Sequence, residues 1–583
     1  MEQREIEKNT PASKLPWSGV SMTEAQRFLL LSTLIGIFAG LLVVAFHIAI
    51  DFIRWYAVGT LAEKTHFATI LSPAIGATIA SLLVIFVFKK ARGSGVNQAK
   101  AAVYVYEGHV PFSTVLGKFL SCSISIGSGN SLGPEDPALQ MGAGVASLLG
   151  RSFHLARDTM RMIAPVGAAA GIAAAFNAPI TAVLFVMEEV VVGWHTGVLG
   201  SIVLSATSAV IVSRFYLGDD PLFSVPTFQL SDPMELIVHA LIGVAGGLLA
   251  VAFMKTIAAL KRRQQGLPGW TRYVLPGAAG AIVGFAGLWF PEVMGAGYEA
   301  IDSALHNRFP WSILLARGLI KIVVTLLCFS AGTPGGMFAP TLFAGAMIGG
   351  ALGSLAQQQP WFPTSPADTY VLVGMGTFFA GVFRAPMTSV FMVFEVSASY
   401  MIILPVIIAN TISYGIARRF QRVPFFQMHA KEDGLDLPSV EAERETRRLR
   451  VEDAMQRPHA VFGPKTHAKT AADLMREAGD TFRLAKTGHG EWCWVCLTEL
   501  DKAIEAGKGG LPLEGIVGRG PAPVLYQDIG LDNALKVIGG HPILPVSSRA
   551  NINELVGTLT LEDIHRIYGI DPSRIPCGPL AAE

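Results

Sequence analysis

Charged residues are scarce in this chain, and the scarcity is confined to its middle. Asp, Glu, Lys and Arg make up 15% of the 583 residues, against about 25% in an average soluble protein. Residues 1–27 and 430–583 hold dense charge, whereas the stretch between them is mostly apolar. A soluble core does not need many apolar runs that can cross a hydrocarbon layer of about 30 Å. Such runs include Phe28–Ile50, Phe67–Phe88, Met234–Leu260 and Ile402–Ala417. The chain is therefore predicted to be an all-α, multi-pass membrane protein that continues into a charged C-terminal region.

Cysteine is rare as well. The cysteines are Cys122, Cys328, Cys493, Cys496 and Cys577. The Cys493–Cys496 spacing is that of a redox or metal motif, but no second cysteine pair accompanies it. Residues three apart on a strand face opposite sides. We therefore expect buried structural thiols in a reducing compartment and no metal site. The net charge of +1 gives no indication of nucleic-acid binding.

The N-terminus lacks the pattern of a secretory signal. Its first 26 residues are polar, without a short apolar core and a small-residue cleavage site, so we expect no cleaved signal peptide. Basic residues beside membrane spans are typical of the cytoplasmic side. They are Arg27, Lys89-Lys90 with Arg92, Lys261-Arg262-Arg263, and Arg418-Arg419 with Arg422. Both termini are accordingly predicted to be cytoplasmic.

What the chain does have is an internal repeat. A glycine–proline turn opens an apolar helix at Gly133–Gly142 and again at Gly336–Gly345, 203 residues later. Phe176–Pro179 and Phe383–Pro386 form a second pair, 207 residues apart. In a membrane chain, repeated interruptions of this kind indicate broken helices that meet at a midplane ion site. Helix N-termini aim N–H groups and a positive dipole end at such a site, so an anion is the expected ligand.

The composition also divides the chain into segments. We predict a cytoplasmic N-terminal segment at 1–26, a membrane part at 27–425 with halves separated near 261–269, a linker at 426–450, and a soluble α/β region at 451–572 before a tail at 573–583. The expected strands and helices of the α/β region are Trp492–Leu497, Glu499–Ala506, Pro545–Val546, Leu555–Leu559 and Leu561–Tyr568.

Three glycine-rich stretches are candidates for the anion site, at Gly93–Asn97, Gly133–Pro137 and Gly335–Pro340. One such stretch alone usually reflects close packing, but their order within a repeat favours a shared site. Ser94 adds a hydroxyl donor. Glu135 is a carboxyl group in an apolar segment, which is costly and by default a functional hypothesis. The alternative for Glu135 is a carboxylate that only satisfies free amides at a helix N-terminus.

These motifs resemble the CLC family of chloride channels and chloride/proton antiporters over about residues 27–430. The resemblance implies two inverted, mostly helical halves per subunit, in a homodimer whose subunits each hold a pathway. Ser94 and the amides of Met337 and Phe338 match the central anion site. Glu135, in the loop that begins at Gly133, matches the gating glutamate, which leaves an anion site when it is protonated.

Glu188 and Glu189 end an apolar run in the first half, and only Glu188 recurs in the second half, as Glu395. A structural role is therefore expected for Glu188. By resemblance, Glu189 matches the inner proton acceptor of CLC antiporters, where channels commonly carry an apolar residue. Paired with Glu135, it favours antiport over the alternative of a passive chloride channel. An intramembrane enzyme or a solute receptor is a remote alternative, because the membrane part contains no zinc motif, nucleophile elbow or phosphate loop. Ser94 also disfavours fluoride as the substrate, while nitrate stays open.

Four positions depart from the family pattern. Asn97 stands where the Gly-Ser-Gly-Ile loop usually ends in proline, and Pro134 and Asp136 replace the basic residue and the glycine that flank the gating glutamate. Pro134 removes an amide donor, and Asp136 is expected to add an acid near the outer anion site. Phe426 aligns with the tyrosine of the central site but has no hydroxyl, so weaker chloride binding is predicted.

The C-terminal region resembles a tandem pair of cystathionine-beta-synthase (CBS) domains over about 451–572, on Val451–Met455 and Gly557–Asp563. By resemblance, Thr560 would bind phosphate and Asp563 the ribose hydroxyls of an adenine nucleotide (ATP, ADP or AMP). Thr498 and Asp501 repeat this spacing. Thr-x-x-Asp is also an ordinary helix start, so a purely dimerising module is the alternative. We thus expect a chloride/proton antiporter that contacts lipid, needs no cofactor and is regulated by this module.

Overall fold

The computed structural model describes residues 24–568, apart from 61–65, 192–195, 220–221, 224, 226–232, 307, 360–365, 433–434, 436, 438–448, 458–460, 489, 516–521, 540 and 550. The chain divides into two compact units, Met1–Ser439 and Val440–Glu583. Most of the predicted N-terminal segment, much of the predicted linker, the predicted tail and Cys577 lie outside the described residues.

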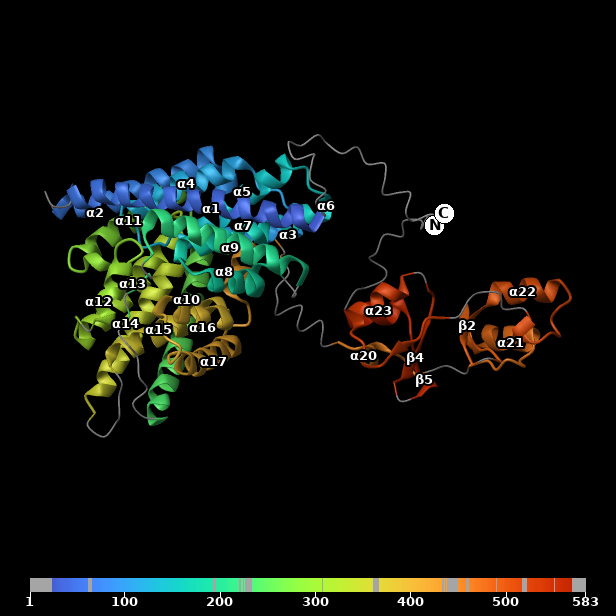
Figure 1. Ribbon diagram of the computed structural model, residues 1–583. Coiled ribbons are helices and arrows are strands. Elements are labelled where there is room, and N and C mark those ends of the chain that lie inside the picture. The colour runs from blue at the N-terminus through green and yellow to red at the C-terminus, as the bar shows by residue number, and fades with distance from the viewer. Residues whose placement is uncertain are drawn as a thin grey trace. The chain divides into compact units, whose positions relative to one another are not determined.

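The first unit is built almost entirely from helices (Figure 1). They are α1 Glu24–Arg54, α2 His66–Leu82, α3 Gly95–Tyr104, α4 Phe112–Gly127, α5 Glu135–Ser152, α6 Arg157–Arg161, α7 Ile163–Phe176, α8 Pro179–Phe185, α9 Thr196–Leu217, α10 Leu236–Gln265, α11 Thr271–Gly287, α12 Tyr298–Leu305, α13 Trp311–Ser330, α14 Phe338–Gln357, α15 Ala367–Phe383, α16 Pro386–Ser397, α17 Ile403–Phe420 and α18 Phe425–Glu432. Short π-helical turns, η4 Leu83–Val87 and η6 Val186–Val190, extend α2 and α8.

Among the described residues, seven helices are long and apolar enough to cross a membrane. They include α1, α2 with η4, and α10, which contain three of the four apolar runs named from the sequence. The fourth run forms α17, which is not among the seven. Large apolar side chains such as Phe52, Phe67 and Phe215 are exposed on these helices, as expected for surfaces that face lipid.

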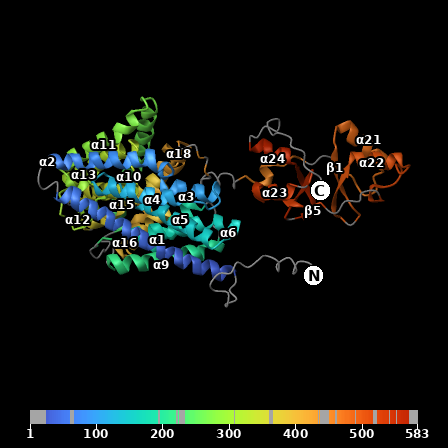
Figure 2. The ribbon, with the colours of Figure 1, turned by 90° about the horizontal axis from the view of Figure 1, so that it is seen from above.

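Equivalent helices of the two halves pack on equivalent partners. In the first half α5 packs on α7 and α1 on α9, and in the second half α14 packs on α15 and α10 on α17. Figure 2 shows α1 beside α9. Close approach of α14 and α15 depends on small residues, since a Cβ on Gly345 would collide with the carbonyl of Gly374.

The broken helices start at the prolines of the repeat. Pro137 and Pro340 are the third residues of α5 and α14, where a missing N–H costs no intrahelical hydrogen bond. Pro179 and Pro386 are the first residues of α8 and α16, a position that proline favours. These starts explain why the chain changes direction at the repeated motifs instead of forming long continuous spans.

The second unit is a small α/β structure. Strands β1 Phe482–Lys486 and β2 Trp492–Cys496 form one antiparallel pair. In a second sheet, β4 Leu544–Ser548 pairs with β3 Leu525–Tyr526 in parallel and with β5 Asn551–Leu559 in antiparallel orientation. The helices are α20 Val451–Ala454, α21 Ala468–Ala478, α22 Leu497–Glu505, α23 Leu531–Ile538 and α24 Leu561–Ile567. The expected strands and helices are present, although α22 begins at Leu497, two residues earlier than predicted.

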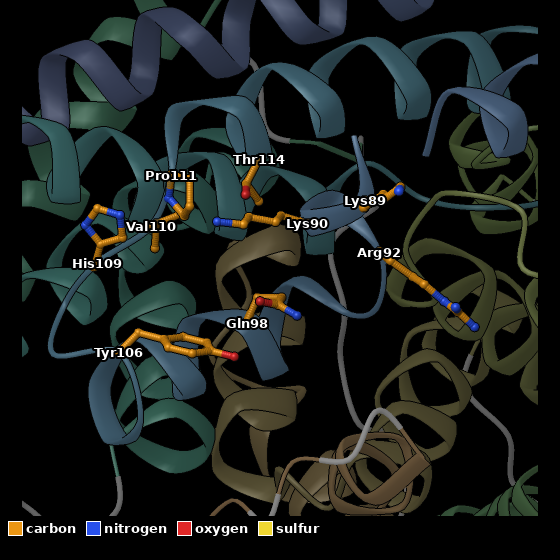
Figure 3. Close-up of a pocket in the computed structure, with 9 residues that line it drawn as sticks. All are labelled: Lys89, Lys90, Arg92, Gln98, Tyr106, His109, Val110, Pro111 and Thr114. Atoms are coloured by element: carbon orange, nitrogen blue, oxygen red, sulfur yellow. The ribbon is translucent and has the colours of Figure 1, made fainter. Parts of the chain in front are cut away.

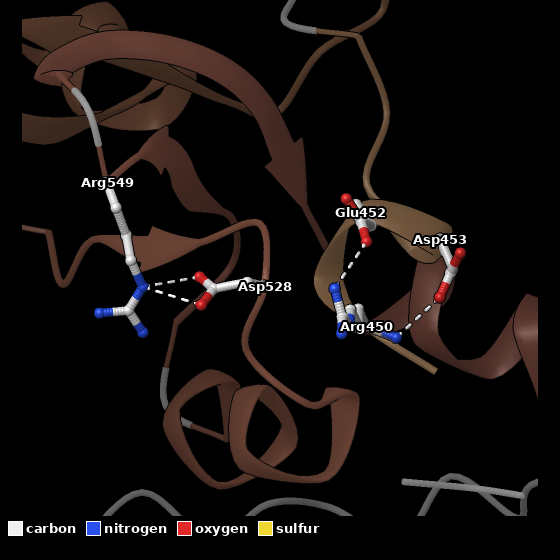
Figure 4. A network of polar contacts seen from close by, with 5 residues as sticks. All are labelled: Arg450, Glu452, Asp453, Asp528 and Arg549. Carbon is white, nitrogen blue, oxygen red and sulfur yellow. Dashed lines mark hydrogen bonds and ion pairs between the residues drawn. The ribbon is translucent and has the colours of Figure 1, made fainter. Parts of the chain in front are cut away.

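Ion pairs on the surface of the second unit join its segments (Figure 4). Arg549 Nε donates to both carboxylate oxygens of Asp528 at 2.8 Å, and this guanidinium lowers the pKa of Asp528. The Arg450 N–H donates to Asp453 at 2.8 Å and so caps α20. Exposed pairs of this kind contribute little to stability.

The two cysteines of β2 differ in burial. Cys493 belongs to a hydrophobic cluster, and burial raises the pKa of its thiol. Cys496 is half-exposed, so the prediction of a buried thiol is wrong for this residue. It is the last residue of β2, where its side chain leaves the core face. Both thiols are free, and no group of metal-ligating residues is found in the described part of the chain.

Candidate functional site

The two repeated glycine–proline turns lie directly against each other. The Gly133 N–H donates to the Gly336 carbonyl at 2.8 Å, and the Gly336 N–H donates to the Gly133 carbonyl at 2.7 Å. This isolated antiparallel bridge joins equivalent residues of the two halves. A reciprocal pair of this kind relates the halves by a local two-fold axis. It also places the N-termini of α5 and α14 side by side.

Glu135 is the first residue of α5 and is fully buried. The Tyr298 hydroxyl, at the start of α12, donates to Glu135 Oε1. The carboxyl group also interacts with the backbone N–H of Ala339 in α14. Gly133 has no side chain, and a Cβ atom placed there would clash with Glu135 Oε2. The same Cβ atom would lie 3.1 Å from the backbone nitrogen of Ala339, the second residue of α14. The glutamate carboxylate thus lies beside the N-terminus of the opposite broken helix.

Ser94 lies at the N-cap of α3 and faces a carboxylate of its own chain. Its hydroxyl donates to Asp136 Oδ1 at 2.8 Å. The N–H groups of Gly95 and Val96 donate to Asp136 Oδ2 and Oδ1 at 2.7 and 3.1 Å. The expectation that Asp136 adds an acid near an outer anion site stays a prediction, because its side chain is bonded to the Ser94 loop. The side chain points there because α3 and α5 begin at the same place.

Met337 and Phe338 occupy the N-cap and first position of α14, and both are buried. N–H groups at these positions have no intrahelical acceptor. The Phe338 ring lies in an aromatic cluster, edge-on to Phe185 at 5.1 Å and to Phe383 at 4.8 Å between ring centroids. This cluster seals the start of α14 with apolar groups.

Phe426 belongs to the same cluster. Its ring stacks on Phe383 at 5.3 Å and lies edge-on to Phe338 at 6.2 Å. Asn97, the departure in the first loop, donates from Nδ2 to the Phe426 carbonyl at 2.9 Å and so ties α3 to α18. The neighbouring Phe425 instead contacts His429, with ring centroids 4.5 Å apart. Of the two phenylalanines, both of which pack against Phe383, Phe426 is the one whose ring contacts the start of α14.

Glu189 lies in η6 and is held by a buried ion pair with Lys100 of α3. Glu188 has a different environment. Its carboxylate accepts hydrogen bonds from the Thr388 N–H and hydroxyl, at 2.9 and 2.8 Å, at the start of α16. Glu395 accepts the equivalent bonds from Thr181, at 2.8 and 2.6 Å, at the start of α8. Each half therefore caps a helix of the other, which accounts for the structural role expected of Glu188.

Two site residues were not named from the sequence. Tyr298 follows a glycine turn with no distinguishing motif. Lys100 did carry a signal, since a lysine six residues after Ser94 in an apolar helix requires a partner. Lys321 of α13 is also fully buried, and its Nζ donates to the carbonyls of Val293 and Gly295 at 2.9 and 2.6 Å.

Three basic cavities in the described part of the first unit have Arg92 in their lining, and two of them bear on the site. One, of about 370 Å³, includes Ser94 in its lining, together with Arg92, Lys118 and Lys261. The other, of about 490 Å³, is lined by residues of η5 (Lys89–Ala91), α3, α4 and their connections (Figure 3). Lys90 points across this cavity in Figure 3, whereas Arg92 points away from the group. Cations in a concave entrance raise the local concentration of anions.

The second unit contains a cavity of about 750 Å³ whose lining includes Thr560 and Asp563. These two residues form a capping box, in which Thr560 Oγ1 accepts from the Asp563 N–H at 3.2 Å. Thr498 and Asp501 lie outside the lining. Asp501 pairs with Arg476, and Thr498 is the second residue of α22 and not its cap. The sequence repeat therefore does not produce two equivalent sites.

The family model and the similar sequences were compared with the whole chain. Residues 75–418 match the protein family described as voltage gated chloride channel. An H(+)/Cl(-) exchange transporter of Cronobacter sakazakii is 31% identical, over 65% of this chain and 84% of that protein. An H(+)/Cl(-) exchange transporter of Vibrio campbellii is 30% identical, over 71% of this chain and 92% of that protein. A slow cyanobacterial Cl-/H+ antiporter has a similar structure, with a TM-score of 0.65 at 23% identity over 71% of this chain and 99% of that one. A eukaryotic CLC transporter structure has a TM-score of 0.61 at 19% identity, over 92% of this chain and 98% of that one. This chain therefore belongs to the CLC family of membrane transport proteins and has its fold.

Proposed function

We propose that this protein exchanges chloride for protons across a membrane. The observation that carries the proposal is the position of Glu135, a buried carboxyl group beside the N-terminus of α14. A helix N-terminus attracts a chloride ion and a carboxylate for the same reason. A carboxylate that competes with chloride there, and leaves on protonation, links the movements of the two ions. Relatives named as H(+)/Cl(-) exchange transporters support this choice.

Glu189 is the proposed inner proton acceptor. It lies in a different element from Glu135 and faces Lys100, so protons and chloride have separate groups to bind. Chloride would bind the Ser94 hydroxyl and the amides of Met337 and Phe338, beside Phe426.

The test is reconstitution into liposomes with a chloride gradient and equal pH on both sides. Exchange predicts that chloride flow drives protons uphill, recorded with a pH electrode. Glu135→Gln should abolish proton movement and leave chloride flux, because an amide cannot carry a proton. Chloride flux without proton movement in the wild-type protein would identify a passive channel instead. Coupled pumping by Glu135→Gln would contradict the gate assignment alone.

For the second unit we propose a CBS pair that binds an adenine nucleotide and regulates transport. The cavity at Thr560 and Asp563 supports this proposal, as does the 92% coverage by a eukaryotic CLC transporter structure, which exceeds the length of the first unit. We further propose a homodimer with both termini in the cytoplasm. Arg92 and Lys261 were both predicted to be cytoplasmic from their charge. They line the same cavity, which supports placing them on the same side of the membrane.

A further inference from the structure

The donors expected to bind chloride at Ser94 are occupied by Asp136. Its side chain is 5% exposed, and its two oxygens receive three hydrogen bonds, from the Ser94 hydroxyl and the N–H groups of Gly95 and Val96. Asp136 Oδ1 alone takes the Ser94 and Val96 bonds. Charge-assisted bonds of this kind are stronger than neutral ones. A chloride ion that reaches Ser94 therefore finds its hydroxyl already hydrogen-bonded to the Asp136 carboxylate.

The same chain contains two carboxylates in a similar arrangement that cap helix starts. Glu188 and Glu395 each accept two backbone N–H groups and a hydroxyl from a helix of the other half. Asp136 differs from these two glutamates because its hydrogen-bond partner, Ser94, lines a cavity. Ser94 lines the basic cavity of about 370 Å³ with Arg92 and Lys118, so an anion that enters this cavity comes next to Ser94. The Glu188 and Glu395 partners are not in the lining of that cavity.

We propose that Asp136 is a tethered competitor of chloride, which holds the Ser94 loop when no anion is bound and must be displaced before chloride binds there. This inference rests on the proposed chloride transport. Because only molecules with a displaced Asp136 are competent at Ser94, the measured chloride affinity is reduced by the competent fraction. The gating glutamate and this aspartate are adjacent in sequence but act on different donors, Glu135 at α14 and Asp136 at α3.

The experiment measures chloride binding by calorimetric titration of full-length protein purified in a chloride-free buffer. Asp136→Asn keeps the size of the side chain but loses its charge, so chloride should bind about tenfold more tightly. Glu395→Gln is the matched control, because it neutralises a cap of the same construction away from the cavity, and its chloride affinity should equal that of the wild type. Ser94→Ala in the Asp136→Asn background should remove the gain, since the two residues share one hydrogen bond.

Unchanged or weaker chloride binding in folded Asp136→Asn would reduce Asp136 to a structural cap and overturn the inference. If Asp136→Asn does not fold, infrared difference spectra of the Glu135→Gln variant test instead whether chloride displaces Asp136. Chloride addition should shift an aspartate carboxylate band as Asp136 leaves its donors, and the absence of any shift would overturn the inference equally. A wild-type protein that neither binds nor transports chloride contradicts the proposed function itself, which separates the two failures.

Discussion

At the scale of single residues, Phe426 is the position that we propose limits how tightly chloride is held. Its ring lies against Phe338 at the start of α14 but carries no hydroxyl. A hydrogen bond to a charged group contributes about 1.5–3 kcal/mol. Phe426→Tyr should therefore tighten chloride binding about tenfold, which corresponds to roughly 1.4 kcal/mol. Calorimetric titration measures the change. Phe425→Tyr is the control, since that ring contacts His429, and an equal effect of both variants would contradict the assignment.

Glu189 allows a second prediction at this scale. Glu189→Gln retains an oxygen that accepts from Lys100 but cannot take up a proton. We expect proton flux in liposomes to fall while chloride affinity stays within about twofold, because the variant leaves the anion donors untouched. The measurement is the ratio of chloride to proton flux. An unchanged ratio would give Glu189 the same structural role as Glu188.

At the scale of elements, the two halves stabilise each other through the exchanged caps. Glu188 caps α16 and Glu395 caps α8 with nearly the same geometry, so neutralising either should cost a similar amount. Glu188→Gln and Glu395→Gln should each lower the free energy of unfolding by about 1.5–3 kcal/mol, the contribution of a hydrogen bond to a charged acceptor. Thermal unfolding in detergent would register this loss as a lower midpoint.

The control for the cap experiment is Glu299→Gln. Glu299 forms only an exposed ion pair with Arg54, at 3.6 Å, and exposed pairs contribute little. Its unfolding midpoint should stay near the wild-type value. A much larger effect for one cap than for the other would show that the halves are not energetically equivalent.

At the scale of the whole molecule, the C-terminal unit offers a test of regulation. Equilibrium dialysis of the full-length protein against labelled ATP, ADP and AMP should show binding that Thr560→Val weakens at least tenfold, since the threonine is the proposed phosphate ligand. Thr498→Val should leave binding unchanged, because Thr498 lies outside the cavity. No binding of any of the three nucleotides would favour the alternative of a structural module, in which the Thr560–Asp563 box only caps α24.

The sequence alone determined the membrane class, the repeat and the broken helices, because these depend on local properties: apolar length, proline position and glycine placement. It also indicated Ser94, Glu135 and Phe426, whose motifs lie within a few residues of the chain. Contacts between distant segments depend on packing instead. Only the tertiary structure showed that Gly133 pairs with Gly336 and that Asp136 points to the Ser94 loop.

The C-terminal unit shows the same division. The elements that were named from the sequence follow from local patterns and lie within two residues of their predicted bounds, except β5, which begins at Asn551, four residues before the predicted start. β1, β3, α21 and α23 were not predicted. Thr498–Asp501 and Thr560–Asp563 have the same spacing, yet only the second pair forms a capping box and lines a cavity. A hydroxyl and a carboxylate three residues apart adopt that geometry when the threonine is the N-cap. In the Thr498–Asp501 segment, α22 already begins at Leu497, so Thr498 is its second residue and cannot be its N-cap.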